Sequence, residues 1–212
     1  MKLKERTLIK TLSLMVIIFL CLNINTFAEV VPVSIIITTE GKIINTVTYG
    51  RYEIRAEKIV SQDKKSLGYC LEIEKEYPSG EKFNLTYDME DQVLGILKAG
   101  YPDHTPEELG LANEDEAYFA TQVALWCYLE KYNVEALDGD ARIIKAIKEI
   151  YNGSDKTRSL SDYEIKTYYT AAEVQDIIML LRKEIEVSPT EEEKVEENTN
   201  NTENNEEIIL GK

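Results

Sequence analysis

Residues 113–132 have the sequence NEDEAYFATQVALWCYLEKY, and this segment decides the fold of the chain. Asn113, followed three residues later by Glu116, has the spacing of a capping box and predicts the start of a helix. The apolar residues that follow cover every face of that helix, up to about Tyr132. A helix that is apolar on all sides is typical of a buried position, so the rest of the domain must pack around it.

Three further helices are predicted on either side of this buried helix. Residues 88–97 carry an Asp N-cap and apolar side chains at helical spacing, and Gly100 and Pro102 follow. Residues 140–151 and residues 171–185 each show an apolar stripe with the period of a helix. Together these segments predict a helical cluster.

The segment before the helical cluster is rich in Val, Ile, Thr and Tyr, with glycines between short runs. It predicts four strands, at residues 33–37, 43–49, 52–60 and 67–73. We therefore expect an α+β fold, in which a β-rich lobe with a sandwich or barrel-like sheet packs against the helical cluster.

Composition limits what the chain can do. Its 212 residues hold 24 Lys and Arg against 39 Asp and Glu, which gives a formal net charge of −15. This balance argues against nucleic-acid binding, because phosphate binding depends on clustered Lys and Arg. A hydrophobic content of 43% is enough to build the core of one sizeable domain. We expect that domain to be a monomer.

The two ends of the chain differ from its middle. Basic residues before an apolar run at residues 12–22, which is too short to cross a membrane comfortably, predict a signal peptide over residues 1–28, with cleavage after Ala28. Residues 188–212 are rich in Glu, Asn and Thr and predict a disordered acidic spacer. The folded domain is therefore expected over residues 29–187, secreted or extracellular and with no membrane segment of its own. We expect attachment to a cell surface to use a part of the protein outside this chain.

Two residues within the predicted domain stand out chemically. Gln122 lies among apolar neighbours in the buried helix, where an amide without a hydrogen-bond partner costs about 2–7 kcal/mol. Cys70 lies in the predicted strand 67–73, on the face opposite Tyr69 and shared with Glu72 and Glu74. The base-rate interpretation is a buried thiol and an amide paired with the backbone.

The segments around these two residues also resemble a known family. Residues 68–72 (GYCLE) and 121–126 (TQVALW) resemble the paired motifs of the Cys-Gln thioester domains of Gram-positive surface proteins. Residues 95–102 (GILKAGYP), between the two motifs, are similar to the end of a helix followed by a Gly-Tyr-Pro turn in that family. The resemblance covers residues 70–135 well, and the flanks only by pattern.

The resemblance implies a bond between the Cys70 sulfur and the Gln122 side-chain carbonyl, formed with loss of ammonia. An amine, expected to be a lysine of a host extracellular or cell-surface protein, would then attack the carbonyl and leave a covalent link. This chemistry works once, so the chain would be an adhesin module and not an enzyme, and it needs no cofactor or metal. Tyr69, Thr121 and Trp126 are the residues that the resemblance places around the thioester.

Three alternatives remain open from the residues alone. The Cys-Gln pair could be inert, in a non-covalent binding or structural domain. Cys70 could form a disulfide with Cys127, although Cys127 is nearly opposite Gln122 in helical phase. His104, in a Pro-bounded loop where a solvated side chain is expected, could make a Cys-His hydrolase with Cys70.

Asp138 and Asp140 form no calcium-loop pattern, and they predict a turn and an N-cap.

Overall fold

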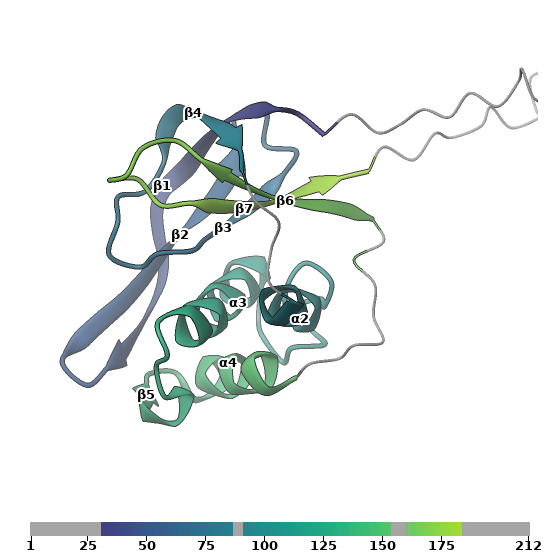
Figure 1. Cartoon of the computed structure of the whole chain (residues 1–212). Helices are drawn as coiled ribbons and strands as arrows, with labels where there is room; N and C mark the ends of the chain where they lie inside the picture. Colours follow the sequence, from purple (N-terminus) through teal and green to yellow (C-terminus); the bar gives the residue numbers. More distant parts are fainter. Residues whose placement is uncertain (1–30, 87–90, 154–159, 161, 184–212) are drawn as a thin grey trace, which may run out of the picture.

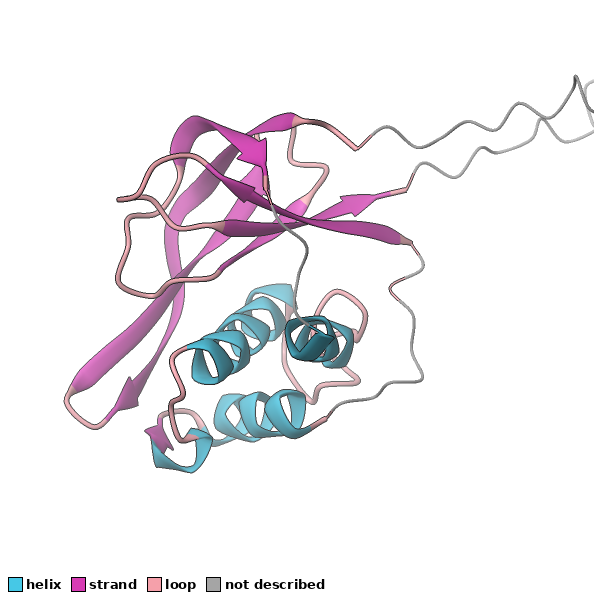
Figure 2. Ribbon diagram, viewed as in Figure 1, coloured by secondary structure: helices cyan, strands magenta, loops and turns pink. Residues whose placement is uncertain are grey.

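A computed structural model describes residues 31–86, 91–153, 160 and 162–183 (Figure 1). The predicted signal peptide and the predicted acidic spacer lie outside these residues. The described part combines one antiparallel sheet with a group of helices on one side of it (Figure 2). The α+β prediction is thereby confirmed.

The sheet closes on itself as a barrel. Its strands in the described part of the chain are β1 (Ser34–Tyr49), β2 (Tyr52–Ser61), β3 (Leu67–Cys70), β4 (Ser79–Leu85), β5 (Leu137–Asp138), β6 (Tyr163–Tyr169) and β7 (Ile177–Arg182). Their order is β2-β3-β7-β6-β4-β1-β5, and β2 also pairs with β1. That extra pairing joins β2, the first strand in this order, to β1 near its other end. The sheet therefore closes, and the predicted barrel-like lobe is present.

The β1–β2 hairpin is longer than the rest of the barrel and continues past it as a two-stranded arm (Figure 1). The two strands predicted at residues 33–37 and 43–49 are one strand, β1, whose register with β2 shifts between Thr39 and Asn45. The far end of β1 pairs with β5, and the Tyr49 ring stacks on Tyr132 with 4.6 Å between the centroids. The arm therefore reaches down to the helical layer.

The helical layer is built around α3 (Glu114–Leu129), which contacts β1 and β2 on one side and α2 (Asp91–Ala99) and α4 (Ala141–Asn152) on the other. This position explains why α3 is apolar all round. Its N-cap is Asn113, whose Oδ1 accepts a hydrogen bond from the Glu116 backbone N–H. The Glu116 carboxylate accepts from the Ala112 N–H, so it reaches one residue further back than the capping box predicts.

The helix predicted at residues 171–185 is wrong, because that segment contains strand β7. Ile177, Ile178, Met179 and Leu180 are all fully buried, so both faces of β7, which pairs with β3 and β6, are covered. A strand covered on both faces shows no polar-apolar alternation, so its apolar run also fits a helical stripe. Strands β4 and β6 were not predicted. The strand predicted at residues 67–73 ends at Cys70, so its alternation does not continue to Glu72 and Glu74.

Candidate thioester site

The site lies where α3 crosses β3, and Tyr118 fixes the two elements together. The Tyr118 hydroxyl donates to the Gly68 carbonyl at 2.9 Å and accepts from the Ile59 N–H at 3.2 Å. The Tyr118 ring stacks on Tyr69, with 4.7 Å between the centroids and an interplanar angle of 13°. One fully buried side chain thus joins α3 to both β2 and β3.

Gly68 has to be glycine for this crossing to form. A Cβ at this position would lie 2.7 Å from Ile59 Cγ2 and 2.7 Å from the Met179 sulfur, closer than real Cβ contacts. The strand is packed on both sides by β2 and β7, so no side chain fits. The chain can therefore bring the Gly68 carbonyl to Tyr118 without a clash.

One turn further along α3, Gln122 lies against the backbone of Cys70. The Gln122 Oε1 accepts from the Cys70 N–H at 2.8 Å, and the Gln122 Nε2 donates to the Cys70 carbonyl at 2.9 Å. Cys70 is fully buried and Gln122 is 1% exposed. The two residues are 52 positions apart in the sequence, and the fold brings them together as the resemblance implies.

The environment of Cys70 keeps its thiol neutral. Burial raises the pKa of the Cys70 thiol well above its ordinary value, and the nearby Glu72 and Glu57 carboxylates raise the pKa further. Both effects disfavour a thiolate at this position. The sulfur of a thioester has no proton to lose. Formation of the thioester would therefore remove the thiol whose ionisation is disfavoured at this position.

Tyr69 precedes Cys70 and Thr121 precedes Gln122, and both bind the backbone of Tyr101 in the turn after α2. The Tyr69 hydroxyl donates to the Tyr101 carbonyl at 2.6 Å, and the Tyr101 N–H donates to the Thr121 Oγ1 at 2.9 Å. The Thr121 hydroxyl also donates to the Ala117 carbonyl within α3. Gly100 packs so closely on Thr121 that no Cβ would fit there. The turn after α2 is therefore fastened to both sides of the site.

Trp126 lies in the core at 1% exposure, one turn after Gln122 on α3. Its indole Nε1 is buried and has no hydrogen-bond partner among the described residues. The place of Trp126 beside a thioester stays a prediction.

The other candidate residues lie apart from the pair. Cys70 and Cys127 are both free and buried, and burial raises the pKa of Cys127 to about 12. The His104 side chain is 20% exposed, so it is more buried than the solvated side chain that the sequence predicts. Its Nδ1 lies 4.0 Å from the Glu108 carboxylate. Among the described residues, no hydrogen bond or ion pair joins His104 to Cys70.

Tyr118 is the residue of the site that the sequence analysis missed. Its place one turn before Gln122 puts both on one face of α3. That spacing was available from the sequence, but a tyrosine in an apolar helix has the appearance of an ordinary core residue. Only the partners of its hydroxyl distinguish it.

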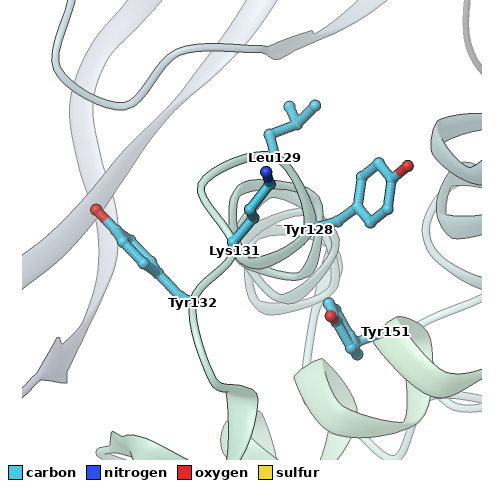
Figure 3. A pocket seen from close by; sticks show the side chains of 5 residues that line it. All are labelled: Tyr128, Leu129, Lys131, Tyr132 and Tyr151. Atoms are coloured by element: carbon cyan, nitrogen blue, oxygen red, sulfur yellow. The ribbon is translucent and has the colours of Figure 1, made fainter.

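A pocket of about 430 Å³ lies at the C-terminal end of α3 (Figure 3). Its lining side chains come from α3, the residues after it and α4: Tyr128, Leu129, Lys131, Tyr132 and Tyr151. None of them is a thiol, an imidazole or a carboxylate, so this pocket contributes no group to the chemistry of the Cys70–Gln122 pair.

Within the described ranges, no cluster of three His, Cys, Asp or Glu side chains could hold a metal ion. No helix of the described chain is long and apolar enough to cross a membrane. Asp140 caps α4 by accepting from the Arg142 and Ile143 N–H groups, which confirms its prediction as an N-cap.

Comparison with known proteins identifies a family that matches part of the chain. Residues 67–156 match the model of the thioester domain family, and the match includes both Cys70 and Gln122. The chain therefore contains a thioester domain. No curated protein matches the chain.

Two solved structures share the fold. The thioester domain of the Enterococcus faecium TIE86 protein is similar with a TM-score of 0.51 and 17% identity, over 72% of this chain and 78% of that chain. The Bacillus anthracis TIE protein is similar with a TM-score of 0.52 and 21% identity, over 71% of this chain and 39% of that chain. At these identities the likeness supports the fold alone.

Proposed function

We propose that Cys70 and Gln122 form an intramolecular thioester through which the domain binds another protein covalently. The observation that carries the proposal is the pair of hydrogen bonds between the Gln122 amide and the Cys70 backbone. These bonds hold the Gln122 amide carbon beside the cysteine that is to attack it. Held in that position, the two groups react as if at a very high local concentration.

Formation of the bond balances without any further reagent. The Cys70 sulfur bonds to the Gln122 Cδ, the bond from Cδ to Nε2 breaks, and the thiol proton leaves with the amide nitrogen as ammonia. The Cys70 N–H already donates to the Gln122 Oε1, so it can stabilise negative charge that develops on this oxygen. Water is excluded because both residues are buried, which protects the product from hydrolysis.

In the second step an amine attacks the same carbonyl carbon. The nitrogen of the amine bonds to the Gln122 Cδ and loses a proton, and the Cys70 sulfur leaves and takes up a proton. The product is an amide bond between Gln122 and the partner, together with a free Cys70 thiol. Because ammonia was lost earlier, the starting state is not regenerated, so the domain acts once and is no enzyme.

We infer that the partner amine is a lysine of a host extracellular protein, and that the domain is an adhesin module. Support comes from the family, since thioester domains are covalent adhesin modules of Gram-positive surface proteins. The predicted export signal agrees with an extracellular site of action. The proposed domain runs over residues 29–187, and cell-surface attachment is assigned to a part of the protein outside this chain.

The competing function is a non-covalent binding or structural domain. One observation favours it, because the Cys70 backbone already satisfies both polar groups of the Gln122 amide and no reaction is needed to explain the burial. The two functions differ in whether a nucleophile becomes attached to Gln122.

A biotin-labelled primary amine tests the proposal. The mature wild-type domain should acquire a label that survives denaturation and reduction, and fragment sequencing should place it on Gln122. Cys70→Ala and Gln122→Ala should stay unlabelled, whereas the control Cys127→Ala should be labelled like the wild type. Equal labelling of Cys70→Ala, or repeated turnover of the amine, would contradict the proposed chemistry.

A further inference from the structure

A second pocket, of about 230 Å³, lies beside the Tyr101–Pro102 turn and is lined by an unusual number of cations for so acidic a chain. The basic side chains come from β2, the β2–β3 turn and β7, and they are Lys58, Lys64, Lys65 and Arg182. The lining also includes the carboxylates Glu40 and Glu114 and the phenol of Tyr163. We call this site the basic pocket.

The four cations differ in their acidic neighbours. Lys58 is paired with Asp115 at 2.5 Å, and Lys65 helps to lower the pKa of the nearby Asp63 carboxyl. No ion pair in the described part of the chain involves Lys64 or Arg182. Two carboxylates, Glu40 and Glu114, also line the basic pocket and offset part of this charge. Four basic side chains against these two carboxylates leave the lining with a formal excess of positive charge, on a molecule with a net charge of −15.

The basic pocket adjoins the proposed reaction site through the backbone of Tyr101. The carbonyl of Tyr101 accepts from Tyr69, which precedes Cys70, and its N–H donates to Thr121, which precedes Gln122. The side of the same turn formed by Tyr101 and Pro102 lines the basic pocket. A partner seated there touches a segment that is fastened to both halves of the site.

We propose that the basic pocket binds a carboxylate side chain of an acidic peptide segment that flanks the acceptor lysine of the partner. This inference rests on the proposed function, and it assigns the domain a recognition site for the sequence around the lysine. The basic side chains of the pocket, Lys64 and Arg182 above all, and the Tyr163 hydroxyl supply the donors for a carboxylate. Attraction by such a patch also raises the rate at which an acidic segment arrives.

The geometry sets the spacing between the acidic residue and the lysine. Glu114 lines the basic pocket and lies eight residues before Gln122 on α3, which corresponds to about 12 Å along the helix axis. An extended peptide covers about 3.3–3.6 Å per residue. The acidic residue is therefore expected about three to four positions from the lysine.

Binding is measured first without any chemistry, in the Cys70→Ala chain, which cannot form a thioester. The probes are two fluorescein-labelled synthetic peptides with one central Lys in a Gly-Ser background. One carries two Asp residues about four positions from the Lys, and the other carries Asn there. Fluorescence anisotropy at low ionic strength should show the Asp peptide binding roughly five- to tenfold more tightly than the Asn peptide. Salt at about 0.5 M should remove the difference.

Charge variants locate the binding site. The double variant Lys64→Gln, Lys65→Gln should bind both peptides equally. The control Lys131→Gln, Lys145→Gln loses the same charge at the far end of α3 and on α4, and it should keep the preference for the Asp peptide. Since α3 is 16 residues long, Glu114 and Lys131 are separated by about 25 Å along its axis. Equal binding of both peptides to the unmodified pocket, or equal loss in both double variants, would overturn the proposal.

Different results would refute the role of the basic pocket and the thioester function. Methylamine is too small to need the basic pocket, so its attachment to the wild-type chain reports the thioester alone. Attachment of methylamine without any preference for the Asp peptide would refute the basic pocket and leave the thioester standing. A preference for the Asp peptide without attachment of methylamine would support the basic pocket and contradict the covalent function.

Discussion

Removing the Tyr118 hydroxyl tests whether this residue sets the register between α3 and β3. Tyr118→Phe keeps the ring that stacks on Tyr69 and takes away only the oxygen that bonds to Gly68 and Ile59. Both backbone groups are buried, so each loses a hydrogen bond that water cannot replace. Since each of the two orphaned buried groups costs about 1–3 kcal/mol, the free energy of unfolding should fall by about 2–6 kcal/mol.

Urea unfolding followed by circular dichroism measures this loss. With a slope of about 2 kcal/mol per M, the midpoint should fall by about 1–3 M. Tyr52→Phe is the matched control, because Tyr52 is 75% exposed and its variant should unfold within about 0.5 kcal/mol of the wild type. The Tyr118→Phe domain should also contain a smaller fraction of thioester, since Gln122 is held less firmly against Cys70. A stability loss below about 0.5 kcal/mol would refute the account of this contact.

Three further predictions concern the surroundings of the pair. Gly100→Ala should destabilise the domain by about 1–3 kcal/mol in urea unfolding, because the new Cβ meets Thr121, and an unchanged midpoint would contradict the close approach. Asn113→Ala should lower the free energy of unfolding by about 0.5–2 kcal/mol through loss of the α3 cap, whereas Asn113→Asp should retain it. The raised pKa of Cys127 means that the folded state holds its proton longer, so stability from this thiol is lost as pH rises from about 9 to about 12. Cys127→Ala should remove that part of the alkaline loss, which an unchanged pH profile would contradict.

The helical layer was largely predictable, because its signals are local. Asn113 and Asp140 cap the helices where the sequence places them, and the apolar surround of α3 follows from its position between the barrel and α4. The strand β7 was not predictable in the same way. Its residues are buried on both faces, one of its paired strands, β3, is distant in the sequence, and nothing in a run such as Ile177–Leu180 separates that situation from a helix.

The candidate site was predictable only through its paired motifs. No local pattern links Cys70 to Gln122 across 52 residues, and the hydrogen bonds that join them depend on how α3 crosses β3. The roles of Tyr118 and of Tyr101 depend on the same crossing, so neither could be assigned in advance. The basic pocket is equally hidden, since Lys58 and Arg182 are far apart in a chain whose overall charge is strongly negative.

The intact mass of the mature wild-type domain under non-reducing conditions tests the central claim most directly. The account predicts a mass lower by one ammonia than the sequence requires, and a gain of one methylamine after incubation with that amine. Gln122→Ala should show neither change. A mass that equals the sequence value and does not respond to methylamine, or a mass lower by two hydrogens through a disulfide of Cys70 with Cys127, would contradict the thioester.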